Sequence, residues 1–186
     1  MKSKMIFPVI SMIFLFVFAS MISVVAQEHH YVGVKKCGMC HKKAKDGEQL
    51  KIWEGSKHSK AYETLKTAEA DKIAMEKYGK KAVETDECLK CHVTGHGADA
   101  ALFEKSFKIE NGVQCESCHG PGKDYKSKKV MKDQAKAIEK GLILYSDEAA
   151  IEKLCRTCHN EKSPSFKEFN FKEMWAKIKH NIPEKK

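Results

Sequence analysis

The chain has 186 residues, a formal net charge of +9 and a charged fraction of 32%. This length is too short for several large domains. Hydrophobic residues make up 42% of the chain, but part of them lie in one N-terminal run, so the remainder cannot build a large core from protein side chains alone. We therefore expect one small hydrophilic domain that needs other apolar material in its interior.

The N-terminus has the features of an export signal. Lys2 and Lys4 precede a mostly apolar run over 5–25, and small residues up to Ala26 suit a cleavage site. This pattern predicts a signal peptide over 1–26 and a domain over 27–186, in the periplasm or another extracytoplasmic space. The run is long for a signal peptide, so an uncleaved membrane anchor stays open as the alternative.

A short motif occurs four times and uses all eight cysteines. Each copy has two cysteines separated by two residues, with a histidine directly after the second: Cys37/Cys40/His41, Cys88/Cys91/His92, Cys115/Cys118/His119 and Cys155/Cys158/His159. Residues three and four apart share one face of a helical turn, so the two thiols can reach the two vinyl groups of one porphyrin. The histidine can then bind the iron as its proximal ligand. The pattern predicts four covalently bound c-type haems.

A zinc ribbon or a disulfide scaffold would also use paired cysteines, but neither requires a histidine after every pair. Four haems would also supply the missing apolar interior, and their attachment requires export. Their propionates would pair with part of the lysine excess, so no nucleic-acid partner is expected.

Histidines outside the motifs are candidates for the second axial ligands. His29 and His30 form either a weakly metal-binding tail or an iron ligand. The ligand role is sterically feasible because Cys37 lies seven positions after His30, and this much extended chain can cross from one face of a haem to the other. His58 lies at the edge of an apolar helical stripe, and we expect it to bind an iron.

Two later histidines complete the set of candidate ligands. His96 lies in a glycine-flanked loop only four positions beyond His92, so it cannot easily reach the far face of the same haem. It binds either a neighbouring haem or a propionate. His180 follows the last expected helix and is a candidate distal ligand, although a regular helix would turn it away from the apolar stripe.

The expected fold is mainly α, with short helices and long loops around four haems and little or no sheet. Periodicity and capping residues predict helices over 48–65, 67–81, 125–140 and from Asn170 onward. A break is possible at Gly55. Thr85 and Ser146 are expected to cap the helices that carry the second and fourth motifs.

Several sequence stretches, in this order, resemble the tetrahaem cytochrome c-554 family over most of the mature chain. The matching stretches are Lys35–Lys42 with its motif, Trp53, Ser59–Ala61 after His58, Cys91–Val93 with its glycine loop, Gly112–Gly122, and Phe171–Met174. The resemblance implies a mostly helical protein whose haems stack in parallel and perpendicular pairs, as in hydroxylamine oxidoreductase and multihaem nitrite reductases. Members of this family shuttle electrons in the periplasm, and the best-known one receives them from hydroxylamine oxidoreductase.

The resemblance also assigns ligands. His58 matches the distal ligand of the third haem, and His180 lies close to that of the fourth. The second haem, on His92, would be five-coordinate, with 163–166 shielding its open face. The family's distal histidine for the first haem is replaced by Lys129, which leaves five candidates or an open site: His29, His30, His96, Lys129 and Met131.

Three functions follow from these observations. The first is an electron carrier between redox partners, such as a multihaem oxidoreductase or a soluble cytochrome. The second is an enzyme that reduces nitric oxide or another nitrogen oxide at an open haem, so enzymatic activity is left undecided. The third is a polymeric cytochrome wire. A membrane contact is expected only if the N-terminal segment stays uncleaved.

Overall fold

The computed structural model describes residues 28–180, and within this range it contains helices and loops with a single isolated β-bridge, between Tyr31 and Phe103. The predicted mainly α class is therefore confirmed. The helices are α1 (Val34–Gly38), α2 (Gln49–Glu54), α3 (Ala61–Thr64), α4 (Ala68–Tyr78), α5 (Asp86–His92), α6 (Glu116–His119), α7 (Lys128–Met131), α8 (Gln134–Glu139), α9 (Glu148–Cys155) and α10 (Phe171–Ile178). Five 3-10 turns lie between them: η1 (Ala44–Asp46), η2 (Lys57–Lys60), η3 (Ala82–Glu84), η4 (Ala100–Leu102) and η5 (Ile109–Asn111).

The predicted signal peptide, residues 1–26, lies outside the described residues. From residue 28 to residue 180, the chain forms no helix with the length and apolar character needed to cross a membrane.

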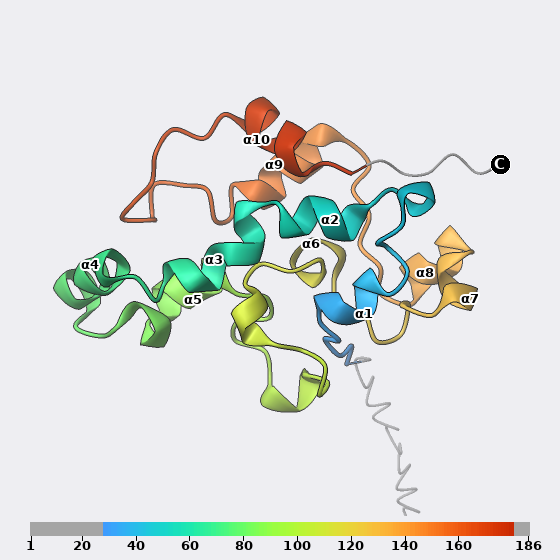
Figure 1. The fold of residues 1–186 in the computed structure, drawn as a ribbon, viewed down its shortest axis with the longest axis horizontal. Helices are drawn as coiled ribbons and strands as arrows, with labels where there is room; N and C mark the ends of the chain where they lie inside the picture. The colour runs from blue at the N-terminus through green and yellow to red at the C-terminus, as the bar shows by residue number, and fades with distance from the viewer. Residues whose placement is uncertain (1–27, 181–186) are drawn as a thin grey trace, which may run out of the picture.

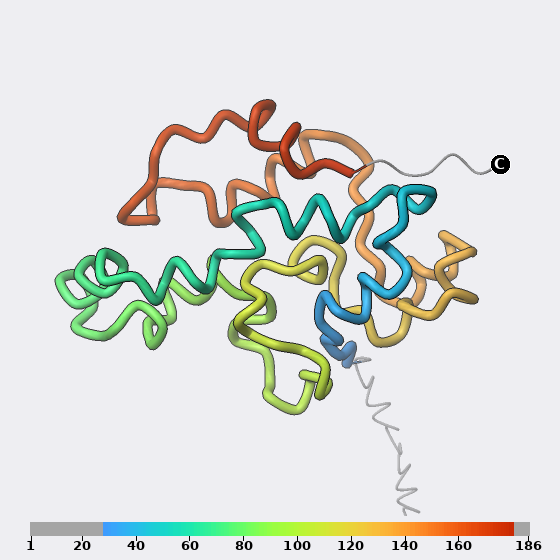
Figure 2. Tube along the Cα trace, viewed as in Figure 1, coloured from blue at the N-terminus to red at the C-terminus, as the bar shows by residue number. Residues whose placement is uncertain are grey.

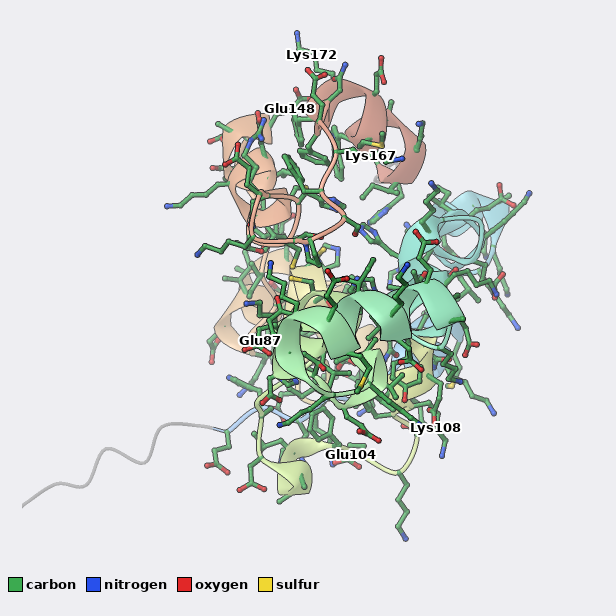
Figure 3. All side chains as sticks on the ribbon, turned by 90° about the vertical axis from the view of Figure 1, so that its left-hand side faces the viewer. Glu87, Glu104, Lys108, Glu148, Lys167 and Lys172 are labelled. Atoms are coloured by element: carbon green, nitrogen blue, oxygen red, sulfur yellow. The ribbon has the colours of Figure 1, made fainter. Side chains whose placement is uncertain are left out.

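The helices are spread along an elongated molecule (Figure 1). Helix α4 lies at one end of the long axis, α7 and α8 lie at the other, and α6 lies near the middle. The N-terminal segment, blue in Figure 2, runs beside the stretch that leads into α7. A backbone hydrogen bond of 3.1 Å from Lys123 to the carbonyl of His30 joins these two segments. Charged side chains such as Glu87, Lys108 and Lys172 project outward around the periphery (Figure 3).

The apolar interior is small and divided. One cluster packs Leu65 against Ala74 and Ala82, between α3, α4 and η3. The other, which we call the Tyr125 cluster, contains Tyr125, Ala137 and Leu142. Several polar side chains are buried as deeply: Ser59, Thr85, Thr94, Gln114 and Glu116. This interior agrees with the expectation that protein side chains alone supply only a small core.

Two of the predicted helices occur nearly as expected. The one expected over 67–81 is α4, and the hydroxyl of Thr67 accepts a hydrogen bond of 3.2 Å from the N–H of Ala70 at its start. The last is α10, where the Asn170 side chain accepts one of 3.3 Å from the N–H of Glu173. It ends at Ile178, so His180 lies beyond the helix.

The other helix predictions differ in detail from the structure. The stretch 48–65 divides into α2, η2 and α3. The expected break at Gly55 is confirmed, since Gly55 is the C-cap of α2 and the backbone is extended at the next residue, Ser56. The expected helix over 125–140 is two helices, α7 and α8, and the Asp133 side chain between them accepts a hydrogen bond of 3.1 Å from the N–H of Lys136. A side chain that caps a new helix here competes with continuation of the preceding one.

The two predicted cap residues of the motif helices also behave differently. Thr85 occupies the N-cap position of α5, but its hydroxyl donates to the carbonyl of Lys81 at 2.8 Å and accepts no capping bond. The cap of α9 is Asp147 rather than Ser146, and its carboxylate accepts a hydrogen bond of 2.8 Å from the N–H of Ala150.

Candidate haem-binding site

Each of the four cysteine motifs forms a turn of helix. The backbone N–H of the motif histidine donates to the carbonyl of the first cysteine at 3.1 Å in the first motif, 3.0 Å in the third and 2.9 Å in the fourth. The second motif lies entirely within α5. This is the local conformation that places both thiols and the histidine on one side of the turn.

The cysteine environments do not support the two alternative readings. All eight thiols are free, so the structure contains no disulfide scaffold. Within residues 28–180 no three histidine, cysteine or acidic side chains come together as a metal ion would require, so the pairs do not assemble into a zinc ribbon.

The motifs contact one another in two pairs. The thiol of Cys37, in the first motif, lies against that of Cys115 in the third, and this contact raises the pKa of Cys37 well above its usual value. The thiols of Cys91 and Cys158 make the same kind of contact between the second and fourth motifs, and it raises the pKa of Cys91.

These two pairs also lie near one another. Burial raises the pKa of the Cys118 thiol in the third motif to about 11, and the nearby thiol of Cys155 in the fourth motif adds to the rise. The motifs are therefore arranged in the spatial order first, third, fourth, second. The first and second motifs are the two ends of this series.

Backbone carbonyls orient two of the motif histidines. The Nδ1 atom of His92 lies 2.7 Å from the carbonyl oxygen of Ala61, and that of His119 lies 3.0 Å from the carbonyl of Ile143. A carbonyl can only accept, so we assign the ring proton to Nδ1 in both residues. The unprotonated Nε2 is then available as a metal ligand, with its ring held by the second hydrogen bond.

Two pairs of imidazole rings lie opposite one another at a tilt, with interplanar angles of 50° and 58°. The ring centroids of His58 and His159 are 6.0 Å apart, and those of His119 and His180 are also 6.0 Å apart. Two imidazoles that share an iron need room for two metal–nitrogen bonds of about 2 Å each. Both separations leave such a gap, so these residues fit a haem iron with two histidine ligands.

These ring pairs favour ligand partners other than those expected from the sequence. His58 faces His159 of the fourth motif, whereas we expected it to serve the third haem. His180 faces His119 of the third motif, whereas we expected it to serve the fourth.

Burial also favours the ligand form of these rings. It lowers the pKa of His58, His119 and His159, and neighbouring histidines lower it further in all three. The three imidazoles are thus held in the neutral form that binds metal.

Contacts with the backbone just before the third motif position His58. The N–H of Val113 donates to the carbonyl of His58 at 3.1 Å, and the indole N–H of Trp53 donates to the carbonyl of Val113 at 2.7 Å. Gly112 has a φ of +65°, and a Cβ built on it would lie 2.7 Å from the His58 carbonyl oxygen. The close approach therefore requires glycine here.

The remaining candidate histidines are each held by a carboxylate. His29 Nδ1 lies 2.7 Å from Asp124, and His30 Nδ1 lies 3.2 Å from Glu104. His96 Nε2 lies 3.5 Å from Asp86 at the start of α5. These contacts do not bring any of the three rings opposite a motif histidine.

The other candidates for the first haem, and the expected shield of the second, lie as follows. Lys129 is exposed on α7, while Met131 packs against the Tyr125 cluster. Phe166, expected near the second haem, lines an open depression of about 730 Å³ together with His159 of the fourth motif.

Glu116, which no sequence pattern distinguishes, lies between the two cysteines of the third motif and is only 3% exposed. Its carboxylate accepts three backbone hydrogen bonds, from Val32 at 2.8 Å, Gly33 at 2.7 Å and Gly122 at 2.6 Å. Burial raises its pKa, and the three bonds oppose that rise. Glu116 thus fixes the N-terminal segment and the loop after the motif to one another.

Attachment turns that leave a histidine Nε2 free, together with facing imidazole pairs, define a c-type cytochrome. A family profile described as "Cytochrome c554 and c-prime" matches residues 36–120. Cytochrome c-554 of Nitrosomonas europaea is 33% identical over 144 residues, which is 72% of this chain and 59% of that protein. The chain belongs to the cytochrome c-554 family, whose cofactor is covalently bound c-type haem. The match spans less than two thirds of the relative's length. No solved structure matches the chain.

Proposed function

We propose that residues 27–186 form a domain with four covalently attached c-type haems that passes electrons between redox proteins. The eight cysteines would anchor the porphyrins, and His41, His92, His119 and His159 would be the proximal ligands. His58 and His180 would complete the coordination of the fourth and third irons. The facing ring pairs support this assignment.

The observation that carries the function is the continuous series of motif contacts. When bound, haem supplies a one-electron couple between ferric and ferrous iron. Contacts between Cys37 and Cys115 and between Cys158 and Cys91, and the nearness of Cys118 to Cys155, keep neighbouring attachment sites close together. This order favours stepwise transfer along the chain of sites over chemistry at one isolated centre.

The location and partners are part of the proposal. The predicted signal peptide over 1–26 would deliver the chain to the periplasm, where haem attachment takes place. The resemblance to the family supports a multihaem oxidoreductase, such as hydroxylamine oxidoreductase, or a soluble cytochrome as donor or acceptor.

A second function, reduction of a nitrogen oxide at an open second haem, is favoured by one observation. His96 is the histidine that follows the second motif most closely in sequence. Its Nε2 atom lies next to Asp86, and its ring does not lie opposite His92, the expected proximal ligand of the second haem. The iron on His92 would then have one open face.

Mass spectrometry and spectroscopy test both functions. The intact protein should exceed the 27–186 polypeptide by four haem masses, and electron paramagnetic resonance should count the low-spin and high-spin ferric irons. Carbon monoxide uptake by about one quarter of the ferrous haems would show the open site. A protein without covalent haem would refute the first function, and four low-spin irons without carbon monoxide uptake would refute the second.

A further inference from the structure

The excess positive charge of the molecule is concentrated at one end. We call residues 33–47 and 123–143 the basic end; they contain twelve lysines and four acidic residues, a difference of +8. The lysines are Lys35, Lys36, Lys42, Lys43, Lys45, Lys123, Lys126, Lys128, Lys129, Lys132, Lys136 and Lys140. The rest of the described chain has 18 basic and 20 acidic residues, so it is close to neutral.

The two stretches of the basic end are neighbours in space. Helices α7 and α8 lie at one end of the long axis, and α1 lies next to them toward the middle of the molecule (Figure 1). Tyr125, in the second stretch, packs with Ala137 and lies close enough to Cys37 of α1 for that thiol to raise its pKa further than burial alone. The charges therefore act as one field at the surface.

The lysine side chains of the basic end are free to meet a partner. All except Lys140 are exposed, and within residues 28–180 only Lys123 among them forms an ion pair, with Glu104. Two of the acidic residues are engaged elsewhere, because Asp124 binds His29 and Asp133 caps α8.

Exposed apolar side chains accompany these lysines. Met39, between the two cysteines of the first motif, is 63% exposed, and Ile138 and Ile143 are 48% and 46% exposed. An apolar centre with a charged rim is the usual composition of a protein–protein interface. The first motif lies within this surface, and its second cysteine, Cys40, is exposed.

The opposite end of the motif series differs in charge. Residues 63–99 surround the second motif and contain six lysines and eight acidic residues. Since the first and second motifs are the two ends of the series, the two terminal sites present surfaces of opposite sign.

We propose that the basic end is the docking surface for an acidic electron-transfer protein, which exchanges electrons at the first motif. The proposal rests on the proposed function, since it gives the first haem a partner. Charge complementarity selects the partner, and apolar contact around Met39 favours a folded protein over a nucleic acid or a lipid surface.

Flavodoxin serves as the acidic probe. Its anionic flavin hydroquinone gives up one electron and becomes the neutral semiquinone, while one ferric haem becomes ferrous, and no proton has to move. Binding of oxidised flavodoxin is measured by calorimetry at low and high ionic strength, and the electron-transfer rate by stopped flow. Anionic vesicles are titrated in parallel.

Three paired charge reversals are compared, each changing the net charge equally. Lys43→Glu/Lys45→Glu and Lys128→Glu/Lys132→Glu change the basic end, and Lys72→Glu/Lys80→Glu changes exposed residues at the α4 end. Each basic-end pair should weaken binding about tenfold at low ionic strength, and the α4 pair less than about twofold.

Equal losses from all three pairs would show that only net charge matters, and would overturn the proposal. Absence of any loss, or equally tight binding to anionic vesicles, would overturn it as well. The proposed function fails separately, if the protein lacks haem or is not reduced by dithionite.

Discussion

The backbone N–H of Gly33 donates a hydrogen bond of 2.7 Å to the carboxylate of Glu116, 83 residues later in the chain. This bond uses Oε2, whereas Oε1 accepts from Val32 and Gly122. Glu116→Gln places an amide N–H₂ opposite one of these N–H donors. We expect a loss of about 2 kcal/mol in the free energy of unfolding, measured with guanidinium chloride. Glu110→Gln, at an exposed position, is the matched control, and an equal small loss in both variants would contradict the role of Glu116.

Gly112 and Gly79 have similar backbone conformations, with φ of +65° and +69°, but different surroundings. A Cβ at Gly112 would meet the His58 carbonyl, while one at Gly79 has no atom within 4 Å. Gly112→Ala should therefore cost about 1–3 kcal/mol more than Gly79→Ala. It should also change one low-spin signal in the paramagnetic resonance spectrum, because His58 is displaced. Equal effects of the two variants on stability and spectrum would count against the close contact.

The partners of His58 and His180 are testable by double variants. If His58 and His159 ligate one iron, then His58→Ala and His159→Ala together should remove one low-spin signal, the same one that each removes alone. His58→Ala combined with His119→Ala should remove two. The reverse result, with one signal lost in the second combination, would restore the pairing expected from the sequence.

Asp147 is the observed N-cap of α9, whereas Ser146 is the predicted one. Hydrogen bonding from Ala150 lowers the pKa of Asp147, and the Ser146 hydroxyl lowers it further. Asp147→Ala should lower the thermal midpoint more than Ser146→Ala at neutral pH. A depressed pKa means that the contribution of Asp147 is present above the ordinary value of 3.8 and is lost as the pH falls through the folded-state value. The two variants should therefore converge in strongly acidic solution, and a constant difference would contradict the cap.

Local features of the site were predictable from the sequence. The attachment turns need only the spacing of two cysteines and a histidine, and α4 needs only Thr67 and its charge pattern. Both depend on residues within a few positions of one another, where propensity and capping decide the conformation.

Long-range relationships were not predictable in the same way. Helical periodicity places His58 on a stripe of its helix, but it does not say which motif that stripe faces. Glu116 had no distinguishing signal, because its partners Val32 and Gly33 are remote in sequence and contribute backbone groups. The division of the helix over 125–140 at Asp133 depended on a side chain that can either cap a helix or lie within one.

The facing histidine pairs have a consequence for the unfolded chain. His58 and His159 are 101 positions apart, and His119 and His180 are 61 apart. An iron between the members of each pair would close these stretches into loops that the free polypeptide lacks. Closing loops of this length removes conformational entropy from the unfolded ensemble, worth about 4 kcal/mol each by the argument used for disulfides. If every cysteine is bonded to a porphyrin, none can form a disulfide. The iron–histidine bonds would then cross-link the chain in place of disulfides.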